Sequence, residues 1–172
     1  FKQLHACLYF QTPIDQWIHA FKRQQVYPFL QGFVQLLWGK IIADVEQLPT
    51  AIIPVPQSHQ RYRQRGYNPV ELLAKNLAKT LGIEVIADAV CAQAQVIPQK
   101  YCSGARRKNN IKNIFRVTGR ALPARIAILD DVIASGNTVR ALAKVLHQSG
   151  VEDIEVWTIA KTKMMHATLQ GS

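Results

Sequence analysis

A segment of thirteen residues in the C-terminal half constrains the fold of this chain more than any other feature. It reads IAILDDVIASGNT from Ile126 to Thr138: four apolar residues, two adjacent carboxylates, two more apolar residues, then five small or polar ones. The pattern predicts a buried strand over 126–129 and, after a turn, a helix over 139–148 and a second strand over 154–159. A strand, a helix and a strand in so short a stretch predict a βαβ unit, and therefore an α/β fold.

The polar residues of this segment predict a site for a ribose 5-phosphate. Asp130 and Asp131 would end the strand at the carboxyl edge of the sheet, where open α/β folds bind their ligands. Paired carboxylates there can accept hydrogen bonds from ribose hydroxyls, directly or through a hydrated Mg²⁺. The next small residues let backbone N–H groups approach an anion at the start of a helix. These residues are Ala134, Ser135, Gly136, Asn137 and Thr138.

The same segment has two alternative interpretations. The aspartates could simply begin a turn and the polar residues cap a helix, although the complete arrangement is more specific than that. A nucleotide site of another kind is disfavoured, because neither GxxxxGK[ST] nor GxGxxG occurs in the sequence.

The rest of the chain alternates between helical and strand patterns. Apolar periodicity predicts helices over 14–21, 28–45 and 69–81, and apolar runs predict a strand over 51–53 and short strands near residues 83–86 and 89–92. We expect a helical segment over residues 1–48 that packs on a main domain over residues 49–172. Three aromatic residues are expected in the core: Trp17, Trp38 and Trp157.

Positive charge is concentrated in two stretches. The 172 residues carry 21 Lys and Arg against 11 Asp and Glu, a net charge of +10. No acidic residue occurs over 47–70 or over 89–129. The excess of positive charge predicts an anionic partner, either a phosphorylated small molecule or a nucleic acid or both. Each lysine or arginine alone, however, could be a solvated surface residue. The candidate contacts are Arg61, Arg63, Arg65, Lys100, Arg106, Arg107, Lys108 and Lys112, with Tyr67 available for stacking on a base or for packing under the next helix.

The cysteines and the hydropathy of the chain bear on its metal sites, its disulfides and its location. Cys7, Cys91 and Cys102 are widely spaced with no CxxC pair, so we expect neither a zinc site nor a disulfide framework. This usage favours a reducing, cytoplasmic location. The most apolar helical stretch is interrupted by polar residues, so no membrane span is expected.

Several segments of the sequence resemble those of a known family. IAILDDVIASGNT resembles the phosphoribosyl pyrophosphate (PRPP) motif of the type I phosphoribosyltransferases. The segments from Ala6 to Lys22, from His59 to Ala78 and from Pro98 to Phe115 resemble the ComF family of competence proteins, above all in RYRQRGYN and in the PQ…RR…N…F block. The matched segments cover most of residues 6–161.

The resemblance implies a type I phosphoribosyltransferase-like fold, with a central, mostly parallel sheet flanked by helices. It implies that Asp130 and Asp131 bind the ribose and Mg²⁺ and serve any catalysis, and that residues 134–138 bind the 5-phosphate of PRPP. The turn with Val55 and Pro56 would be the pyrophosphate loop, and residues 93–113 the loop that covers the site. ComF proteins commonly begin with a four-cysteine zinc ribbon; this chain has none, and Cys7 is not assigned as a ligand.

The function implied is DNA uptake during natural transformation, with single-stranded DNA and proteins of the DNA-uptake machinery as partners. Two alternatives stay open at this stage. One is a metabolic phosphoribosyltransferase that uses a base or an amine as acceptor, although no acceptor site is evident after Ile154; the other is a non-catalytic PRPP sensor. The sequence leaves open whether phosphoribosyl transfer occurs and whether the chain forms a homodimer.

Overall fold

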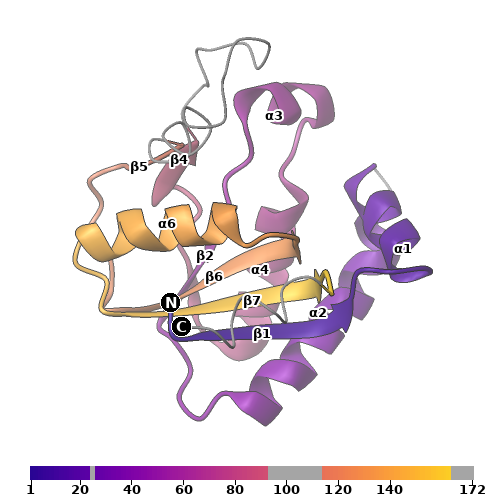
Figure 1. Cartoon of the computed structure of the whole chain (residues 1–172), viewed down its shortest axis with the longest axis horizontal. Helices are drawn as coiled ribbons and strands as arrows, with labels where there is room; N and C mark the ends of the chain where they lie inside the picture. Colours follow the sequence, from indigo (N-terminus) through magenta and orange to yellow (C-terminus); the bar gives the residue numbers. More distant parts are fainter. Residues whose placement is uncertain (24–25, 93–113, 164–172) are drawn as a thin grey trace.

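A five-stranded sheet forms the centre of the molecule (Figure 1). The structure is a computed structural model that describes residues 1–23, 26–92 and 114–163. The strands lie in the order β1-β7-β6-β2-β3, and each neighbouring pair is parallel. Their bounds are β1 (Gln3–Tyr9), β2 (Ala51–Pro54), β3 (Glu84–Val85), β6 (Arg125–Ile133) and β7 (Asp153–Lys161). The predicted α/β class with a parallel sheet is confirmed.

Helices cover both faces of this sheet. On one face, α1 (Ile14–Lys22), α2 (Val26–Asp44) and α4 (Pro69–Leu81) pack on the strands to form one apolar core. On the other face, α6 (Asn137–Gln148) forms a second core together with the antiparallel pair β4 (Val90–Ala92) and β5 (Phe115–Val117). Strand β6 serves both cores, because alternate residues of a strand point to opposite faces.

The helix α4 follows the sequence prediction closely. Asn68 is its N-cap and its side chain accepts a hydrogen bond from the Val70 N–H, while Pro69 occupies the first turn. Gly82 ends the helix in the left-handed conformation, at φ 70°. These local signals are strong enough to define a helix without any knowledge of tertiary contacts.

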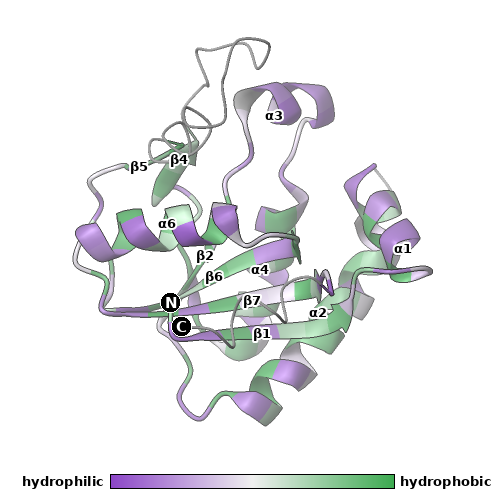
Figure 2. Ribbon diagram, viewed as in Figure 1, coloured by the Kyte–Doolittle hydropathy of each residue, from purple (hydrophilic) through white to green (hydrophobic). Residues whose placement is uncertain are grey.

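Two elements differ from the sequence predictions. The segment expected to be helical over 1–48 begins with the edge strand β1, whose mixed residues pair only with β7 and lack a clear alternating pattern. The arginine-bearing segment, for which the sequence predicts neither a helix nor a strand, is the short helix α3 (His59–Arg65), which is hydrophilic over its whole length (Figure 2). A helix without an apolar stripe leaves no periodic signal, and here Ser58 and Gly66 cap it at its two ends.

Strand β6 is longer than predicted, and this changes the position of the two aspartates. The strand continues to Ile133, and its pairing with β7 includes Asp130 opposite Thr158 and Val132 opposite Ala160. Asp130 and Asp131 therefore lie inside the paired part of β6, close to its carboxyl end, and not after the strand. Their backbone is fixed by the sheet on which any ligand would rest.

Only one of the three tryptophans is in the core. Trp157 on β7 is fully buried, but Trp17 is 42% exposed and Trp38 is 39% exposed. Helix α2 is apolar on almost every side, so its periodicity does not reveal which positions face the sheet. The expectation for Trp38 was wrong for that reason. It was also wrong for Trp17, which lies on α1, where Ile18 and Phe21 are the buried residues.

Candidate functional site

The adjacent carboxylates Asp130 and Asp131 are the centre of the candidate site, near the carboxyl end of β6. In this strand Ala127 and Leu129 face the core under α1, α2 and α4, whereas Ile126 and Ile128 face the core under α6. Asp131 continues the first series and is 5% exposed. Asp130 continues the second series, and its carboxylate accepts a hydrogen bond of 2.9 Å from the Asp131 N–H.

The electrostatic state of the two carboxylates differs from that of ordinary surface acids. Burial, followed by the negative charge of Asp131, raises the pKa of Asp130 from 3.8 to about 7. The Asp131 N–H and the positive charges of Lys22 and Arg61 act in the opposite direction without overcoming these effects. Among the described residues, none forms an ion pair with Asp130. The site therefore holds more negative charge than its surroundings neutralise.

Lys22 is a functional candidate that the sequence analysis did not identify. Its ammonium lies 2.9 Å from Asp131 Oδ1, and the lysine side chain is 26% exposed. Lys22 is the last residue of α1, which stands beside the carboxyl ends of β1 and β7 (Figure 1). No sequence spacing links a lysine at position 22 with an aspartate at position 131, because only the fold brings the two together.

The turn after β6 has the backbone geometry of an anion-binding turn. Gly136 is left-handed at φ 72° and is followed at once by α6, so the first N–H groups of that helix face outward. The Ser135 hydroxyl lies 3.4 Å from the Asn137 N–H, and the Arg140 guanidinium donates to the Ser135 carbonyl at 2.7 Å. Arg140, also missed by the sequence analysis, thus anchors this turn. The residues left exposed in it are Ala134, Ser135, Asn137 and Thr138.

Two threonines on and after β7 hold the same region from the neighbouring strand. The hydroxyl of Thr158 donates to the carbonyl of Asp131 at 3.1 Å, and that of Thr162 donates to the carbonyl of Ala134 at 2.9 Å. These bonds fix the backbone on both sides of the turn. The backbone that carries the polar side chains of the turn is therefore held in place by hydrogen bonds from β7 and from Thr162.

The turn after β2, which was predicted to be a pyrophosphate loop, lies next to β6. The Val55 N–H donates to the carbonyl of Leu129 at 2.9 Å, while Pro54 and Pro56 have no N–H. These three residues therefore offer no free backbone donor. The next cations along the chain are the arginines of α3 (His59–Arg65).

Helix α3 separates its three arginines. Arg61 and Arg65 lie one turn apart on a common face, whereas Arg63 is rotated by about 200° from Arg61 and faces another direction. The charge of Arg61 lowers the pKa of Asp130, so Arg61 is the arginine that acts on the carboxylate pair. Arg61 and Arg63 are exposed and Arg65 is half-buried.

Tyr67 lies between α3 and α4 and lines a cavity of about 460 Å³ beside the candidate site. The remaining predicted contacts fall outside the described residues: Lys100, Arg106, Arg107, Lys108 and Lys112. In the described part of the same acid-free stretch, Arg120 pairs with Glu84 and Asp88, and Arg125 pairs with Asp153. Those two arginines support the fold.

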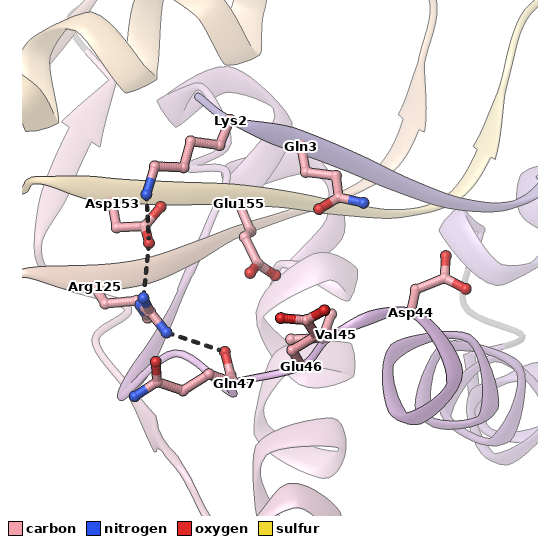
Figure 3. Close-up of a pocket in the computed structure, with 9 residues that line it drawn as sticks. All are labelled: Lys2, Gln3, Asp44, Val45, Glu46, Gln47, Arg125, Asp153 and Glu155. Carbon is pink, nitrogen blue, oxygen red and sulfur yellow. Dashed lines mark hydrogen bonds and ion pairs between the residues drawn. The ribbon is translucent and has the colours of Figure 1, made fainter.

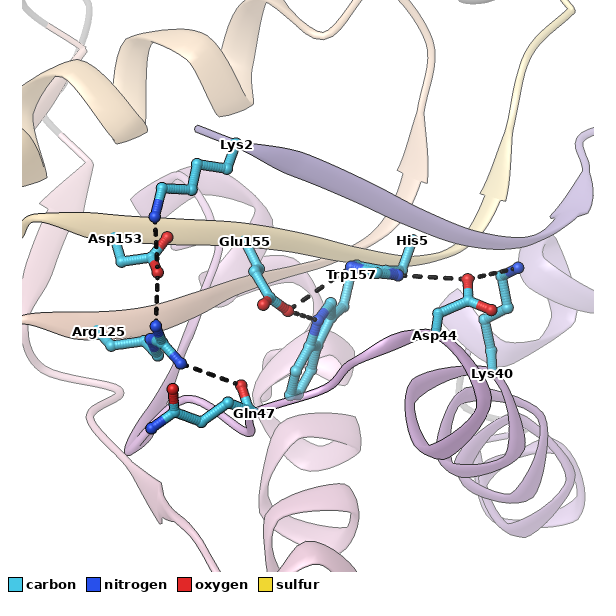
Figure 4. Close-up of polar contacts among 9 residues, drawn as sticks. All are labelled: Lys2, His5, Lys40, Asp44, Gln47, Arg125, Asp153, Glu155 and Trp157. Atoms are coloured by element: carbon cyan, nitrogen blue, oxygen red, sulfur yellow. Dashed lines mark hydrogen bonds and ion pairs between the residues drawn. The ribbon is translucent and has the colours of Figure 1, made fainter.

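A second cavity, of about 400 Å³, lies at the opposite end of the sheet (Figure 3). Both of its basic residues pair with one acid: Asp153 is 3.1 Å from both the Lys2 ammonium and the Arg125 guanidinium. Nearby, Glu155 accepts from the Trp157 indole at 3.0 Å, and Asp44 pairs with Lys40 and with buried His5 (Figure 4). This arrangement is a structural network that joins β1, β6, β7 and α2.

Two general observations concern the part of the chain that the structure describes. No group of three His, Cys, Asp or Glu side chains is placed so that it could hold a metal ion. None of the helices is long and apolar enough to cross a membrane.

Burial raises the pKa of the Cys7 thiol to about 11, so this cysteine is protonated at neutral pH.

The sheet order, the carboxylate pair and the turn before α6 define a protein with the type I phosphoribosyltransferase fold. A crystal structure of adenine phosphoribosyltransferase from Trypanosoma brucei, in complex with AMP, pyrophosphate and ribose-5-phosphate, aligns with a TM-score of 0.54 at 15% identity, over 87% of this chain and 60% of that chain. Competence protein F of Haemophilus influenzae is 34% identical over 157 residues, which cover 87% of this chain and 68% of that protein. The DNA utilization protein YhgH of Escherichia coli K12 is 33% identical, over 89% of this chain and 69% of that protein.

This chain therefore belongs to the family of competence protein F and the DNA utilization proteins YhgH. The family resemblance given by the sequence motifs is thereby confirmed, as is the fold that it implied. No protein-family model matches the chain.

Proposed function

We propose that this chain binds a ribose 5-phosphate, with PRPP as the activated form, and handles single-stranded DNA during DNA uptake in natural transformation. The observation that carries the ligand proposal is the order of groups along β6: an under-neutralised carboxylate pair, then a supported turn that leads into α6. The ribose-5-phosphate in the T. brucei enzyme and the names of the relatives in competence and DNA utilization support it further.

In this proposal each polar group has a defined part. Asp130 and Asp131 accept hydrogen bonds from the ribose hydroxyls, since an ionised carboxylate is an acceptor only. The 5-phosphate is held by the N–H groups at the start of α6 and by the Ser135 and Thr138 hydroxyls. Arg61 lies on the side of the diphosphate, beside the turn that includes Val55 and Pro56.

The residues of the site also suit Mg²⁺. Carboxylate oxygens are hard ligands, and Mg²⁺ typically uses one or two of them together with phosphate oxygens of the substrate. Burial and the negative charge of Asp131 raise the pKa of Asp130, and a divalent cation beside the pair would favour the ionised form of this carboxyl group. When bound, Mg²⁺ supplies charge neutralisation for the diphosphate, while the protein residues position the sugar.

The DNA part of the proposal depends on charge. Helix α3 presents Arg61 and Arg63 to solvent directly beside the ligand site, and the chain has a net charge of +10. The sugar-phosphate site itself uses mainly backbone and hydroxyl groups, so it does not account for this excess. A single strand of nucleic acid that lies along α3 would bind this excess positive charge through its phosphates, since contacts with phosphates contribute much of the affinity for single strands.

The test is to titrate the protein separately with ribose 5-phosphate, with PRPP and Mg²⁺, and with a single-stranded oligonucleotide. We expect saturable binding of both sugar phosphates by calorimetry. Binding of the oligonucleotide should weaken with salt, with a logarithmic slope of about −0.7 for each phosphate contacted. Failure to bind either sugar phosphate would contradict the ligand assignment, and salt-independent DNA binding would contradict the DNA assignment.

The same titration separates binding from transfer. Release of pyrophosphate from PRPP in the presence of a base or an amine would identify a phosphoribosyltransferase with that acceptor. Binding of PRPP combined with DNA binding is the result that we expect from the proposed function, whether or not turnover accompanies it. Turnover with a free base and no affinity for DNA would replace the proposal by a metabolic one.

A further inference from the structure

An aromatic cavity lies beside the ligand site, between the N-terminal end of α2, helix α3 and the start of α4. Its volume of about 460 Å³ is within the range of small-molecule sites, about 300–1,000 Å³. Three tyrosines from three different segments line it: Tyr27, Tyr62 and Tyr67. Tyr67 packs against the first core, whereas neither Tyr27 nor Tyr62 belongs to a core, so core packing alone does not explain the convergence of the three rings.

Two of these rings are unusually open to solvent. Tyr27 is 75% exposed and Tyr62 is 51% exposed. The charged groups of the cavity wall neutralise each other, since the Lys75 ammonium lies 2.7 Å from a Glu71 carboxylate oxygen. The cavity therefore offers ring faces and apolar surface, and it carries no net charge of its own.

The charge next to the cavity comes from α3. Tyr62 is flanked in sequence by Arg61 and Arg63, and Arg65 follows on the next turn. Arg61 acts on Asp130 of the sugar-phosphate site, while Tyr62 lines the aromatic cavity. One short helix thus presents a cation to one site and a ring to the other.

We propose that this cavity binds a nucleobase of single-stranded DNA, which stacks on Tyr27 and Tyr62 while the adjacent phosphates contact the arginines of α3. Stacking on a ring requires an exposed base face, which a single strand offers and a duplex does not. The flanking arginines favour a base attached to a phosphate chain over a free base. The inference rests on the proposed function and goes beyond it by naming the site that holds the base, including Tyr27, which no sequence motif indicated.

The experiment compares two strands of equal length by fluorescence anisotropy: an oligothymidylate and an abasic strand that has the same sugar-phosphate chain without bases. Tyr27→Leu and Tyr62→Leu should each weaken binding of the oligothymidylate by about 5- to 150-fold, the range found for loss of one stacked base. Neither variant should change the affinity for the abasic strand by more than about twofold. Tyr62→Phe should retain binding of both strands, because the stacking ring is kept.

Two further variants serve as controls. Trp38→Leu removes an aromatic ring of similar exposure from α2 outside the cavity and should leave both affinities unchanged. Arg61→Gln combined with Arg63→Gln should weaken both strands alike, since it removes phosphate contacts. Because Tyr27 and Tyr62 are exposed, their replacement should not prevent folding, and circular dichroism verifies this.

The outcomes distinguish this inference from the proposed function. If the wild-type protein binds both strands but the tyrosine variants do too, the cavity does not hold a base and only this inference fails. The same conclusion follows if the variants lose both strands equally. If free thymidine binds the cavity and loses affinity in the tyrosine variants, while the affinity for the oligothymidylate does not change in those variants, the site binds a free nucleoside and not a base of the strand. If the wild-type protein binds neither strand at low salt, the DNA assignment itself is wrong, and this inference falls with it.

Discussion

The two ends of the parallel sheet both carry clusters of charge, but they differ in how well the charges are compensated. At the amino end, Asp153 has two cationic partners, and Asp44 is paired with Lys40 at 2.6 Å (Figure 4). At the carboxyl end, Asp131 has one cation, Lys22, and Asp130 accepts only its neighbour's N–H among the described residues. The pKa values follow the same division: Lys40 lowers the pKa of Asp44, whereas burial and Asp131 raise the pKa of Asp130 to about 7.

This difference separates a network that stabilises the fold from a site prepared for a ligand. An acid with two cationic partners, such as Asp153, has little to gain from a further cation, because its charge is already compensated. A buried acid with too few partners costs free energy in the unliganded protein, and a ligand that supplies donors or a cation removes that cost. We therefore expect mutations at the amino end to change stability and mutations at the carboxyl end to change binding.

The largest effect should come from replacing both acids of the carboxyl end. Asp130→Ala combined with Asp131→Ala removes the acceptors for the ribose hydroxyls, and we expect affinity for ribose 5-phosphate to fall at least about 100-fold, since several hydrogen bonds to charged groups are lost. DNA affinity should stay the same or increase, because two negative charges disappear. Calorimetry with ribose 5-phosphate and anisotropy with an oligonucleotide measure the two quantities.

The matched control for that variant is Asp153→Ala at the amino end, which should bind ribose 5-phosphate as the wild-type protein does. If the double variant binds the sugar phosphate normally, the ligand site has been misplaced. If Asp153→Ala also abolishes binding while the protein stays folded, the two ends are not functionally distinct.

The second effect is a change of stability with opposite sign at the two ends. The folded protein keeps a proton on Asp130 at pH values at which the unfolded chain has lost it, because its pKa is raised from 3.8 to about 7. Its contribution to stability therefore falls as pH rises from about 4 to about 7. Asp130→Asn should raise the free energy of unfolding by up to about 4 kcal/mol at pH 8 and by little near pH 4.

Asp153→Asn should do the reverse at pH 8 and lower the free energy of unfolding by about 1–2 kcal/mol. It weakens two ion pairs of a carboxylate whose side chain is 15% exposed, although the Lys2 partner is largely solvated. Urea unfolding of both variants without divalent cations measures these changes. The comparison would be wrong if Asp130→Asn destabilised the protein at pH 8 as much as Asp153→Asn does.

The sequence predicted the parts of the fold that have local signals. The capping of α4 by Asn68 and Gly82, and the βαβ unit around α6, could be recognised from neighbouring residues alone. The helix α3 could not, since its seven residues have no apolar stripe. Nor could the exposure of Trp38, because an almost uniformly apolar helix does not show which side is buried.

The candidate site divides in the same way. Asp130, Asp131 and the turn that follows are contiguous in sequence, so their chemistry could be inferred from one segment. Lys22 is 109 positions away from its partner Asp131, and Tyr27 comes near Tyr62 only through the packing of α2, α3 and α4. Residues that join a site through tertiary structure carry no local sequence signal.

The third prediction compares the lysines that serve the two clusters. Lys22→Met removes a positive charge that lowers the pKa of Asp130, so Asp130 should titrate at higher pH than in the wild-type protein. Lys40→Met should raise the pKa of Asp44 from its lowered value, while leaving the titration of Asp130 unchanged. Carbon-detected NMR titration of the aspartate carboxyl groups measures both. An unchanged Asp130 titration in Lys22→Met would show that Lys22 does not act on the pair.

The smallest effect separates two arginines of the same helix. Arg61 acts on Asp130, whereas Arg63 faces away from Arg61 by about 200°, so only Arg61 is placed to meet a diphosphate at the ligand site. Arg61→Gln should weaken PRPP binding about fivefold, as expected for one charged contact of about 1 kcal/mol at a solvated position, and ribose 5-phosphate binding by less. Arg63→Gln should change neither by more than about twofold. Equal losses in both variants would indicate a diffuse effect of net charge, which salt titration of the two variants identifies because such an effect disappears at high ionic strength.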